Sequence, residues 1–341
     1  MEGGKKMSIT TLRSGLLTTI QDLGRYGYQK YGVIVSGAMD TYSLRIANLL
    51  VGNSKEEAAL EITLMGPTLL VEKDMLIAIT GGDLSPTIEG VSVPLWRPVF
   101  VKKGSKLQFG AQKSGCRAYL AVAGGFAVQR MMKSKSTYLR AEIGGYQGRA
   151  IQEGDVLETN PISEGAFSQI EKLKNKQYKG AFLTTNWSVR WNEFLPLTKN
   201  PNIRVLPGAQ FEQFTANSKQ QFFTQSFRVS PQSDRMGYRL SGPSIELEEK
   251  LEMLSEAVAH GTIQIPPDGN PIILLADRQT TGGYPKIGQV ATVDLPVVAQ
   301  VMPGQSLSFT EITLEKAERL YVEREKSLKQ LAVSINYKLK Q

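Results

Sequence analysis

The sequence has few of the residues that build disulfides and transition-metal sites. Its 341 residues include one cysteine, Cys116, and one histidine, His260. A single cysteine excludes a disulfide within the chain and is typical of a reducing compartment. No cysteine–histidine cluster exists to hold zinc, so we predict no metal ligands of that kind, although a carboxylate site for magnesium stays open. We interpret Cys116 as a packing residue and His260 as a structural histidine rather than a catalytic base.

Long hydrophobic runs are missing as well. No segment reaches the roughly 20 apolar residues that a membrane helix requires, and the first ten residues lack the apolar core of a signal peptide. We therefore expect a cytoplasmic protein that does not associate with membranes. The net charge of +8 would suit nucleic acid, but the positive residues are dispersed rather than gathered in one stripe. We expect no nucleic-acid partner.

Glycine and proline are plentiful and spread along the chain, with 32 and 16 copies. This distribution favours short strands joined by tight turns, so the fold class is mainly β with few helices. Strands are predicted at 76–79, 117–122, 271–275 and 289–293, and a hairpin joins 99–101 to 107–109. Helical spacing predicts a helix at 42–50, capped by Asp40 and ended by Gly52. A second helix is predicted over 314–331, followed by a tail that frays.

Two parts of the chain resemble each other. Residues 95–109 and 295–309 share Leu, Val, Gly, Leu and Phe at one constant offset. Weaker matches in the same order align Ser36 with Ser233, Met39 with Met236, and Glu61 with Glu256. This order favours an internal duplication over two unrelated hairpins. The predicted domains are 1–160 and 201–315, joined by a connector at 161–200 and followed by a C-terminal helix or tail at 316–341.

Two clusters carry candidate chemistry. The first is the stretch Thr280–Tyr284, in which hydroxyls and backbone N–H groups can hold carboxylate or phosphate oxygens. The alternative is a β-bulge or corner that needs glycine for its own geometry. The second cluster spans 233–239, where Arg235 or Arg239 is suited to bind a substrate carboxylate through two parallel hydrogen bonds. The alternative there is a surface salt bridge.

Several longer strings are similar to one known family, the allophanate hydrolase subunit 2 family, also called the biotin-dependent carboxyltransferase or KipA family. The similar strings are Gln21–Arg25, Ser36–Asp40, Leu60–Glu61, Arg117–Leu120, Ser233–Gly237 and Asp277–Pro285. The resemblance covers about residues 8–315, and residues 29–33 and 133–138 are most similar to the Bacillus KipA branch. It implies two tandem cyclophilin-like β-barrel domains related by duplication.

The resemblance also implies a function and partners. Relatives include the C subunit of an ATP-dependent 5-oxoprolinase, which converts 5-oxoproline to glutamate with a smaller cyclophilin-like B subunit, of the KipI type, and a third protein. ATP with Mg would act within that complex, on a small-molecule amide. One alternative is a regulatory protein that antagonises a KipI-type inhibitor of a sporulation kinase. Another is a carboxyltransferase acting on urea or a related amide, with biotin on a separate carrier because this chain has no attachment motif.

The matching strings suggest which residues form the site. We expect Arg235 to clamp a carboxylate, and Asp277 or Glu256 to act as the acid or base or to bind a metal-nucleotide. The remaining residues would bind the substrate and wrap a phosphorylated or carboxylated intermediate: Arg239, Gln264, Gln279, Thr280, Thr281, Gly282, Gly283 and Tyr284.

Overall fold

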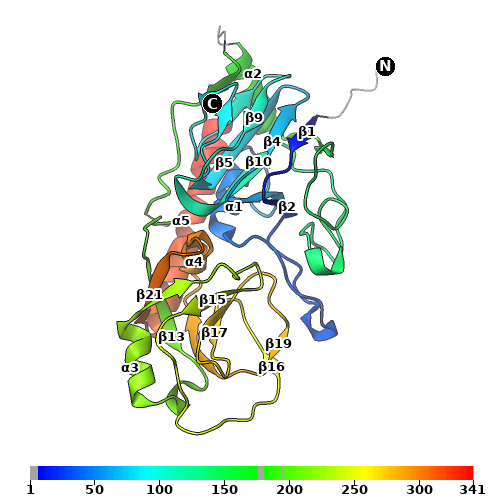
Figure 1. Ribbon diagram of the computed structural model, residues 1–341. Coiled ribbons are helices and arrows are strands. Elements are labelled where there is room, and N and C mark those ends of the chain that lie inside the picture. The colour runs from blue at the N-terminus through cyan, green and yellow to red at the C-terminus, as the bar shows by residue number, and fades with distance from the viewer. Residues whose placement is uncertain (1–6, 176–179, 194, 341) are drawn as a thin grey trace. The chain divides into compact units, whose positions relative to one another are not determined.

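The computed structural model describes residues 7–175, 180–193 and 195–340 (Figure 1). The chain forms two compact units, each built from separate segments of sequence. The first unit takes 1–24, 40–193 and 328–341, and the second takes 25–39 and 194–327. The second unit therefore includes a segment, 25–39, that the repeat would assign to the first half, and the first unit includes the end of the predicted C-terminal helix. The boundaries at 160 and 200 stay a prediction, and the connector includes 176–179 and 194, outside the described residues.

The first unit holds two sheets, each with six strands among its described residues. One sheet has the order β11 (Val156–Glu158), β1 (Ser8–Arg13), β4 (Thr68–Val71), β9 (Lys106–Gln108), β6 (Thr87–Ile88) and β7 (Val91–Ser92). The other has the order β12 (Phe182–Thr184), β8 (Val99–Val101), β5 (Met75–Asp83), β10 (Ser114–Val122), β3 (Ala59–Thr63) and β2 (Leu17–Gln21). The helices of this unit are α1 (Thr41–Leu50) and α2 (Glu164–Lys174).

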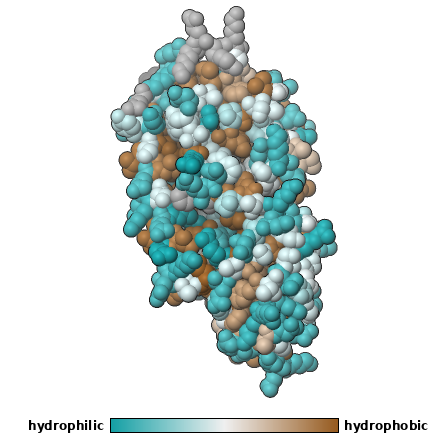
Figure 2. Space-filling model, turned by 90° about the vertical axis from the view of Figure 1, so that its left-hand side faces the viewer, coloured by the Kyte–Doolittle hydropathy of each residue, from teal (hydrophilic) through white to brown (hydrophobic). Residues whose placement is uncertain are grey.

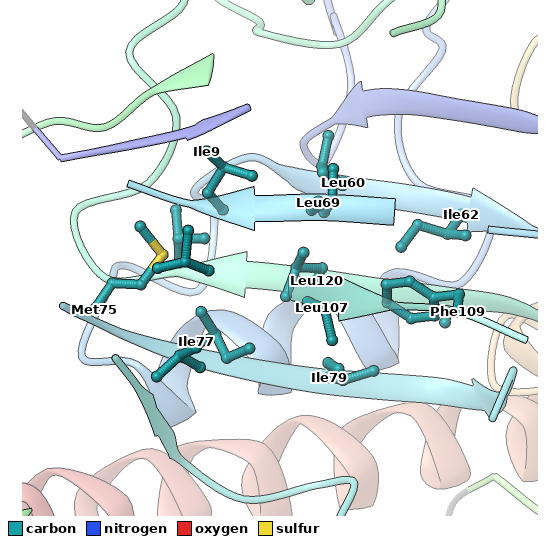
Figure 3. Packing of buried hydrophobic residues seen from close by; sticks show 14 of the residues in the cluster. Ile9, Leu60, Ile62, Leu69, Met75, Ile77, Ile79, Leu107, Phe109 and Leu120 are labelled. Carbon is teal, nitrogen blue, oxygen red and sulfur yellow. The ribbon is translucent and has the colours of Figure 1, made fainter. Parts of the chain in front are cut away.

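The core of the first unit gathers side chains from both sheets (Figure 3). Ile9, Leu69 and Leu107 come from one sheet, and Ile77 and Leu120 from the other, and each is 1% exposed or less. Partly buried residues of β1 alternate with buried ones because one face meets the core and the other faces outward. Strand β5 is buried along nearly its whole length, because α1 packs against it and covers its second face.

The second unit contains a closed barrel. Its strand order is β13 (Asn202–Pro207), β20 (Lys286–Val290), β17 (Thr262–Gln264), β18 (Ile272–Leu274), β15 (Gly237–Ser241), β14 (Ser226–Val229) and β21 (Ser306–Glu311). Parallel pairing of β21 with β13 closes the ring. Phe222 of α3 (Ala216–Thr224) stacks on Phe309 of β21, with ring centroids 4.6 Å apart, and Phe227 lies beside them. A separate pair is β16 (Glu256–Ala257) with β19 (Thr281–Gly282).

The prediction of a mainly β fold with few helices is confirmed. The strands at 76–79 and 117–122 lie within β5 and β10, and β18 covers most of the strand at 271–275. The first helix is α1, and the carboxylate of Asp40 caps it by accepting a hydrogen bond from the backbone of Ser43 at 2.9 Å.

Three local predictions were wrong. The strands at 99–101 and 107–109 exist, but they belong to different sheets and do not form a hairpin. The residues of the second repeat that match 95–101 form α4 (Leu295–Gln300), in which Pro296 suits the first turn of a helix. The strand expected at 289–293 ends at Val290.

The C-terminal helix α5 runs over Leu314–Lys340, so its end does not fray within the described residues. Leu328, Ile335 and Leu339 are at most 4% exposed, and this burial explains why the helix continues beyond 331. No helix in the described part of the chain is long and apolar enough to cross a membrane. On the face that Figure 2 shows, hydrophilic and hydrophobic residues are interspersed.

Candidate functional site

The predicted catalytic pair Arg235 and Asp277 forms a buried ion pair in the second unit. Arg235 lies just before β15 and Asp277 just after β18, and these strands pair, so the two residues meet at one end of the barrel. Arg235 donates from Nε to Asp277 Oδ2 at 2.8 Å and from Nη2 to Oδ1 at 3.1 Å. The side chains are 5% and 8% exposed. Both carboxylate oxygens of Asp277 are therefore occupied by the guanidinium.

Arg235 also holds a turn of the segment 25–39, which belongs to the same unit. Its Nη2 donates to the carbonyl oxygen of Gly37 at 2.6 Å. The preceding residue, Ser36, has φ = 55°, a left-handed conformation that is uncommon for a residue other than glycine. Ser36 is 4% exposed, and its Oγ has no hydrogen-bond partner among the described residues. A buried hydroxyl without a partner costs free energy, so this turn is held by its surroundings.

His260 and Arg278 lie beside this ion pair. Burial is the largest cause that lowers the pKa of His260, and the positive charges of Arg278 and Arg235 add to it, bringing the pKa to about 3. The imidazole is therefore neutral at physiological pH, in keeping with the interpretation of His260 as structural. Its Nε2 is buried and has no hydrogen-bond partner in the described part of the chain.

The stretch Thr280–Tyr284 lies against β16. Glu256 stands opposite Gly282 in this short antiparallel pair, and Gln264 donates from Nε2 to the carbonyl of Tyr284 at 3.2 Å. A Cβ at Gly282 would lie 2.6 Å from Gln264 Nε2, so a larger residue here would require the Gln264 amide to move. At Gly283 the nearest atom to such a Cβ is Ser255 Oγ at 3.4 Å, a milder restriction. The ligand and the corner interpretations of this stretch both stay predictions.

Glu256 differs from Asp277 in accessibility. Its side chain is 52% exposed, and its Oε2 forms an ion pair with Lys286 Nζ at 2.8 Å. Lys286 Nζ also donates to the carbonyl of Ala257 at 3.3 Å, which fixes the cation beside β16. Of the two carboxylates predicted as acid or base, Glu256 is thus the one that a ligand can reach.

The structure brings most of the predicted site residues together. The segment that carries Gln279, Thr280 and Thr281 connects Asp277 to β19, and Val258 donates its backbone N–H to the carbonyl of Thr280 at 3.2 Å. Arg239 is not part of this group. It is exposed on β15, between Tyr238 and Leu240, which are buried, and its side chain has no hydrogen bond or ion pair with the other predicted residues within the described ranges.

Sequence reasoning missed three residues of this region: Ser36, Arg278 and Lys286. Arg278 stood inside a string already singled out, between Asp277 and Gln279. Its Nε donates to the carbonyl of Val258 at 3.4 Å and its Nη1 to that of Leu275 at 3.3 Å. No pattern in the sequence distinguishes an arginine that is paired with a carboxylate from one that is not.

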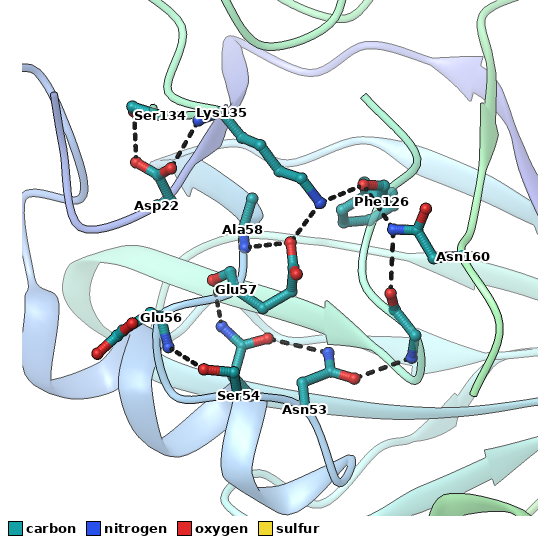
Figure 4. Close-up of polar contacts among 12 residues, drawn as sticks. Asp22, Asn53, Ser54, Glu56, Glu57, Ala58, Phe126, Ser134, Lys135 and Asn160 are labelled. Atoms are coloured by element: carbon teal, nitrogen blue, oxygen red, sulfur yellow. Dashed lines mark hydrogen bonds and ion pairs between the residues drawn. The ribbon is translucent and has the colours of Figure 1, made fainter. Parts of the chain in front are cut away.

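The first unit contains a buried polar network of a different kind (Figure 4). Asp22 accepts hydrogen bonds from the hydroxyls of Ser134 and Ser136 and from the backbone of Lys135, at 2.6 to 2.7 Å. Lys135 Nζ in turn pairs with Glu57 Oε1 at 2.6 Å. These groups satisfy one another, as structural networks do. No group of three or more His, Cys, Asp and Glu among the described residues is placed to hold a metal ion.

Comparison with known proteins gives consistent results. Residues 31–311 match the family model described as carboxyltransferase domain, subdomain A and B. The chain is 37% identical to the proteins named as the C subunit of 5-oxoprolinase in Haemophilus influenzae and Escherichia coli, over 92% and 94% of its residues and 94% and 96% of theirs. It matches the crystal structure of the Kluyveromyces lactis urea carboxylase with a TM-score of 0.84 and 31% identity, over 96% of this chain and 29% of the other. This structural match agrees with the cyclophilin-like β domains that the resemblance implied.

Proposed function

Because the chain belongs to the carboxyltransferase domain family, subdomains A and B, we propose that it is the C subunit of an ATP-dependent 5-oxoprolinase. The observation that carries this proposal is the match over 94% and 96% of two relatives of that name, at 37% identity. The reaction would open the ring of 5-oxoproline to give glutamate. A smaller cyclophilin-like B subunit and a third protein would complete the enzyme in the cytoplasm.

The chemistry favours a site with several hydrogen-bond donors. A lactam is a poor electrophile, and transfer of phosphate from ATP to its oxygen makes the ring carbon easier for water to attack. The hydroxyls of Thr280 and Thr281 and the backbone N–H groups around Gly283 supply donors for the charge that develops. Glu256 supplies the accessible carboxylate, whereas Asp277 serves Arg235. ATP and Mg would bind within the assembled complex.

The test is reconstitution. The chain is co-expressed with the small cyclophilin-like protein and the third component, and glutamate and ADP are measured after addition of 5-oxoproline and ATP. We expect both products only when all three proteins are present. A stable, folded three-protein complex that forms no glutamate would contradict the proposal.

Carboxyl transfer is the second candidate, and the structural match with a urea carboxylase favours it. It requires a biotinylated carrier protein, bicarbonate and an acceptor such as urea. Carboxylation of urea by the chain with such a carrier, and no glutamate from 5-oxoproline, would replace the first proposal by this one. The regulatory alternative would instead be supported if the chain restored the activity of a kinase held by a KipI-type inhibitor, and if Glu256→Gln restored it equally well.

A further inference from the structure

Arg278 is a partly buried guanidinium without a negatively charged partner. Among residues 7–175, 180–193 and 195–340, no carboxylate forms an ion pair with it. Its two hydrogen bonds go to neutral backbone carbonyls, at 3.3 and 3.4 Å, which is long for a charged donor. Burial lowers the pKa of Arg278, and the neighbouring Tyr26 opposes that effect. A guanidinium of this kind is costly unless an anion joins it.

Two other cations described above in this unit have carboxylate partners. Arg235 is paired with Asp277, and Lys286 with Glu256. His260 carries no charge, and Tyr26 and Ser36 are neutral polar residues. Arg278 is thus a positive charge without a carboxylate partner among the described residues, and a ligand with one negative charge would balance it.

We propose that Arg278 binds the carboxylate of a small acidic lactam substrate, and that Arg235 has a positioning role through Asp277 and Gly37. This inference rests on the proposed function, because 5-oxoproline carries one carboxylate. The planar guanidinium matches a carboxylate with two parallel hydrogen bonds, which Arg278 can give after releasing its long bonds to carbonyls. The ring of the lactam would then lie toward the segment Gln279–Tyr284, which follows Arg278 directly in the chain.

The first experiment measures kinetics in the reconstituted complex. We expect Arg278→Met to raise KM for 5-oxoproline by about 10- to 100-fold, the value of one charged hydrogen-bonding partner, with a smaller change in kcat. Arg278→Lys should restore part of the loss. Arg228→Met is the matched control, because Arg228 is an exposed arginine of the same unit that also donates to a backbone carbonyl, that of Gly304. An unchanged KM in Arg278→Met, with wild-type activity present, would overturn the inference and leave the proposed function intact.

The second experiment does not depend on turnover. His260 is the only histidine of the chain, so the Hε1 proton of its imidazole gives one NMR signal that is assigned without ambiguity, and Arg278 acts on this ring electrostatically. The full chain is titrated with 5-oxoproline, with the uncharged analogue 2-pyrrolidinone, and with inorganic phosphate. We expect the signal to move with 5-oxoproline only, and to stay still in Arg278→Met.

The outcomes separate the two proposals. If the signal of the full chain moves with 5-oxoproline while a folded three-protein complex forms no glutamate, the carboxylate site is kept and the proposed function is rejected. Movement with phosphate alone, equal movement with 2-pyrrolidinone, or no movement with any probe would overturn the carboxylate site. Equal movement in wild type and Arg278→Met would overturn it as well.

Discussion

Glu61 in the first unit and Glu256 in the second are aligned by the internal repeat, yet their surroundings differ. Glu61 is 1% exposed on β3, a strand that pairs with β2 on one side and β10 on the other. It accepts a hydrogen bond from the hydroxyl of Tyr119 at 2.7 Å. Glu256 is exposed on β16, for which β19 is the partner. One carboxylate has become part of a core, while the other stays available to a ligand.

The two units can also be compared in their charged groups. In the buried network of the first unit, Lys135 is paired with Glu57. In the second unit, Arg278 has no carboxylate partner in the described part of the chain. Our proposals assign binding to the second unit, whereas the buried network of the first unit is structural. The following experiments test that division, ordered by their effect on the free energy of unfolding.

The largest effect is expected for Arg235→Met. The substitution leaves the buried carboxylate of Asp277 without its cation, and such a loss costs about 3–5 kcal/mol. Urea unfolding of the purified chain measures it, with Arg228→Met as the control that should change by less than about 1 kcal/mol. The double variant Arg235→Met/Asp277→Met should recover much of the loss. A loss under about 1 kcal/mol in the single variant would show that the pair is not structural.

The free energy of unfolding should decrease at acid pH because of His260 in the second unit. The pKa of His260 is lowered from 6.5 to about 3, so its neutral form contributes stability that is complete above pH 6.5. That contribution is lost as the pH falls from 6.5 toward 3, at about 1.4 kcal/mol per pH unit, or about 2 kcal/mol by pH 5. His260→Gln lacks this proton, so its unfolding free energy should fall less steeply over that range. Identical pH slopes in the two proteins would show that His260 is not held neutral.

In the first unit, Tyr119→Phe tests the environment of Glu61. The hydroxyl of Tyr119 donates to Glu61 and accepts from the backbone of Asp40 at 2.8 Å, so its removal takes one hydrogen bond from each of two buried groups. We expect a loss of about 1–2 kcal/mol at pH 7 in urea unfolding. A change below a few tenths of a kcal/mol would mean that the hydroxyl is replaced by water.

Alkali gives a second measurement on Tyr119. Burial first, then the charges of Glu61 and Asp40, raise the pKa of Tyr119 above its usual value of 10.0. The folded state therefore holds the proton more tightly, and stability is complete below pH 10 and is lost as the pH rises toward the folded pKa. The gap in stability between wild type and Tyr119→Phe should narrow above pH 10. A constant gap would contradict a raised pKa.

The sequence predicted the architecture better than the details of pairing. Alternating and continuous apolar runs identified β5 and β10, because burial on one or both faces leaves a local pattern. The prediction of a hairpin at 99–109 was wrong because a strand-turn-strand pattern does not indicate which sheet each strand joins. The place of 25–39 in the second unit likewise depends on long-range contacts, which no local pattern predicts.

The site was predicted as a region rather than as a set of roles. The string Asp277–Pro285 contacts three other predicted residues. Asp277 pairs with Arg235, Gly282 lies opposite Glu256, and Tyr284 accepts a hydrogen bond from Gln264. The roles depended on partners more than forty residues away in some cases: Asp277 is occupied by Arg235, and Glu256 stays open because β16 lies outside the barrel. Such partners are visible only in the three-dimensional structure. For the same reason, the sequence did not show that Arg278 has no carboxylate partner among the described residues.

Glu256→Gln should change stability least and activity most. Its ion pair with Lys286 is half exposed, and such pairs are worth about 0–1 kcal/mol, so urea unfolding should be almost unchanged. Glutamate formation by the reconstituted complex should nevertheless fall by about 10²–10⁴-fold if Glu256 transfers the proton. The repeat supplies the matched control: Glu61→Gln alters the buried counterpart, and it should lower stability by more than Glu256→Gln does. If Glu256→Gln kept full activity while Asp277→Asn in a folded complex lost it, the roles of the two carboxylates would be reversed.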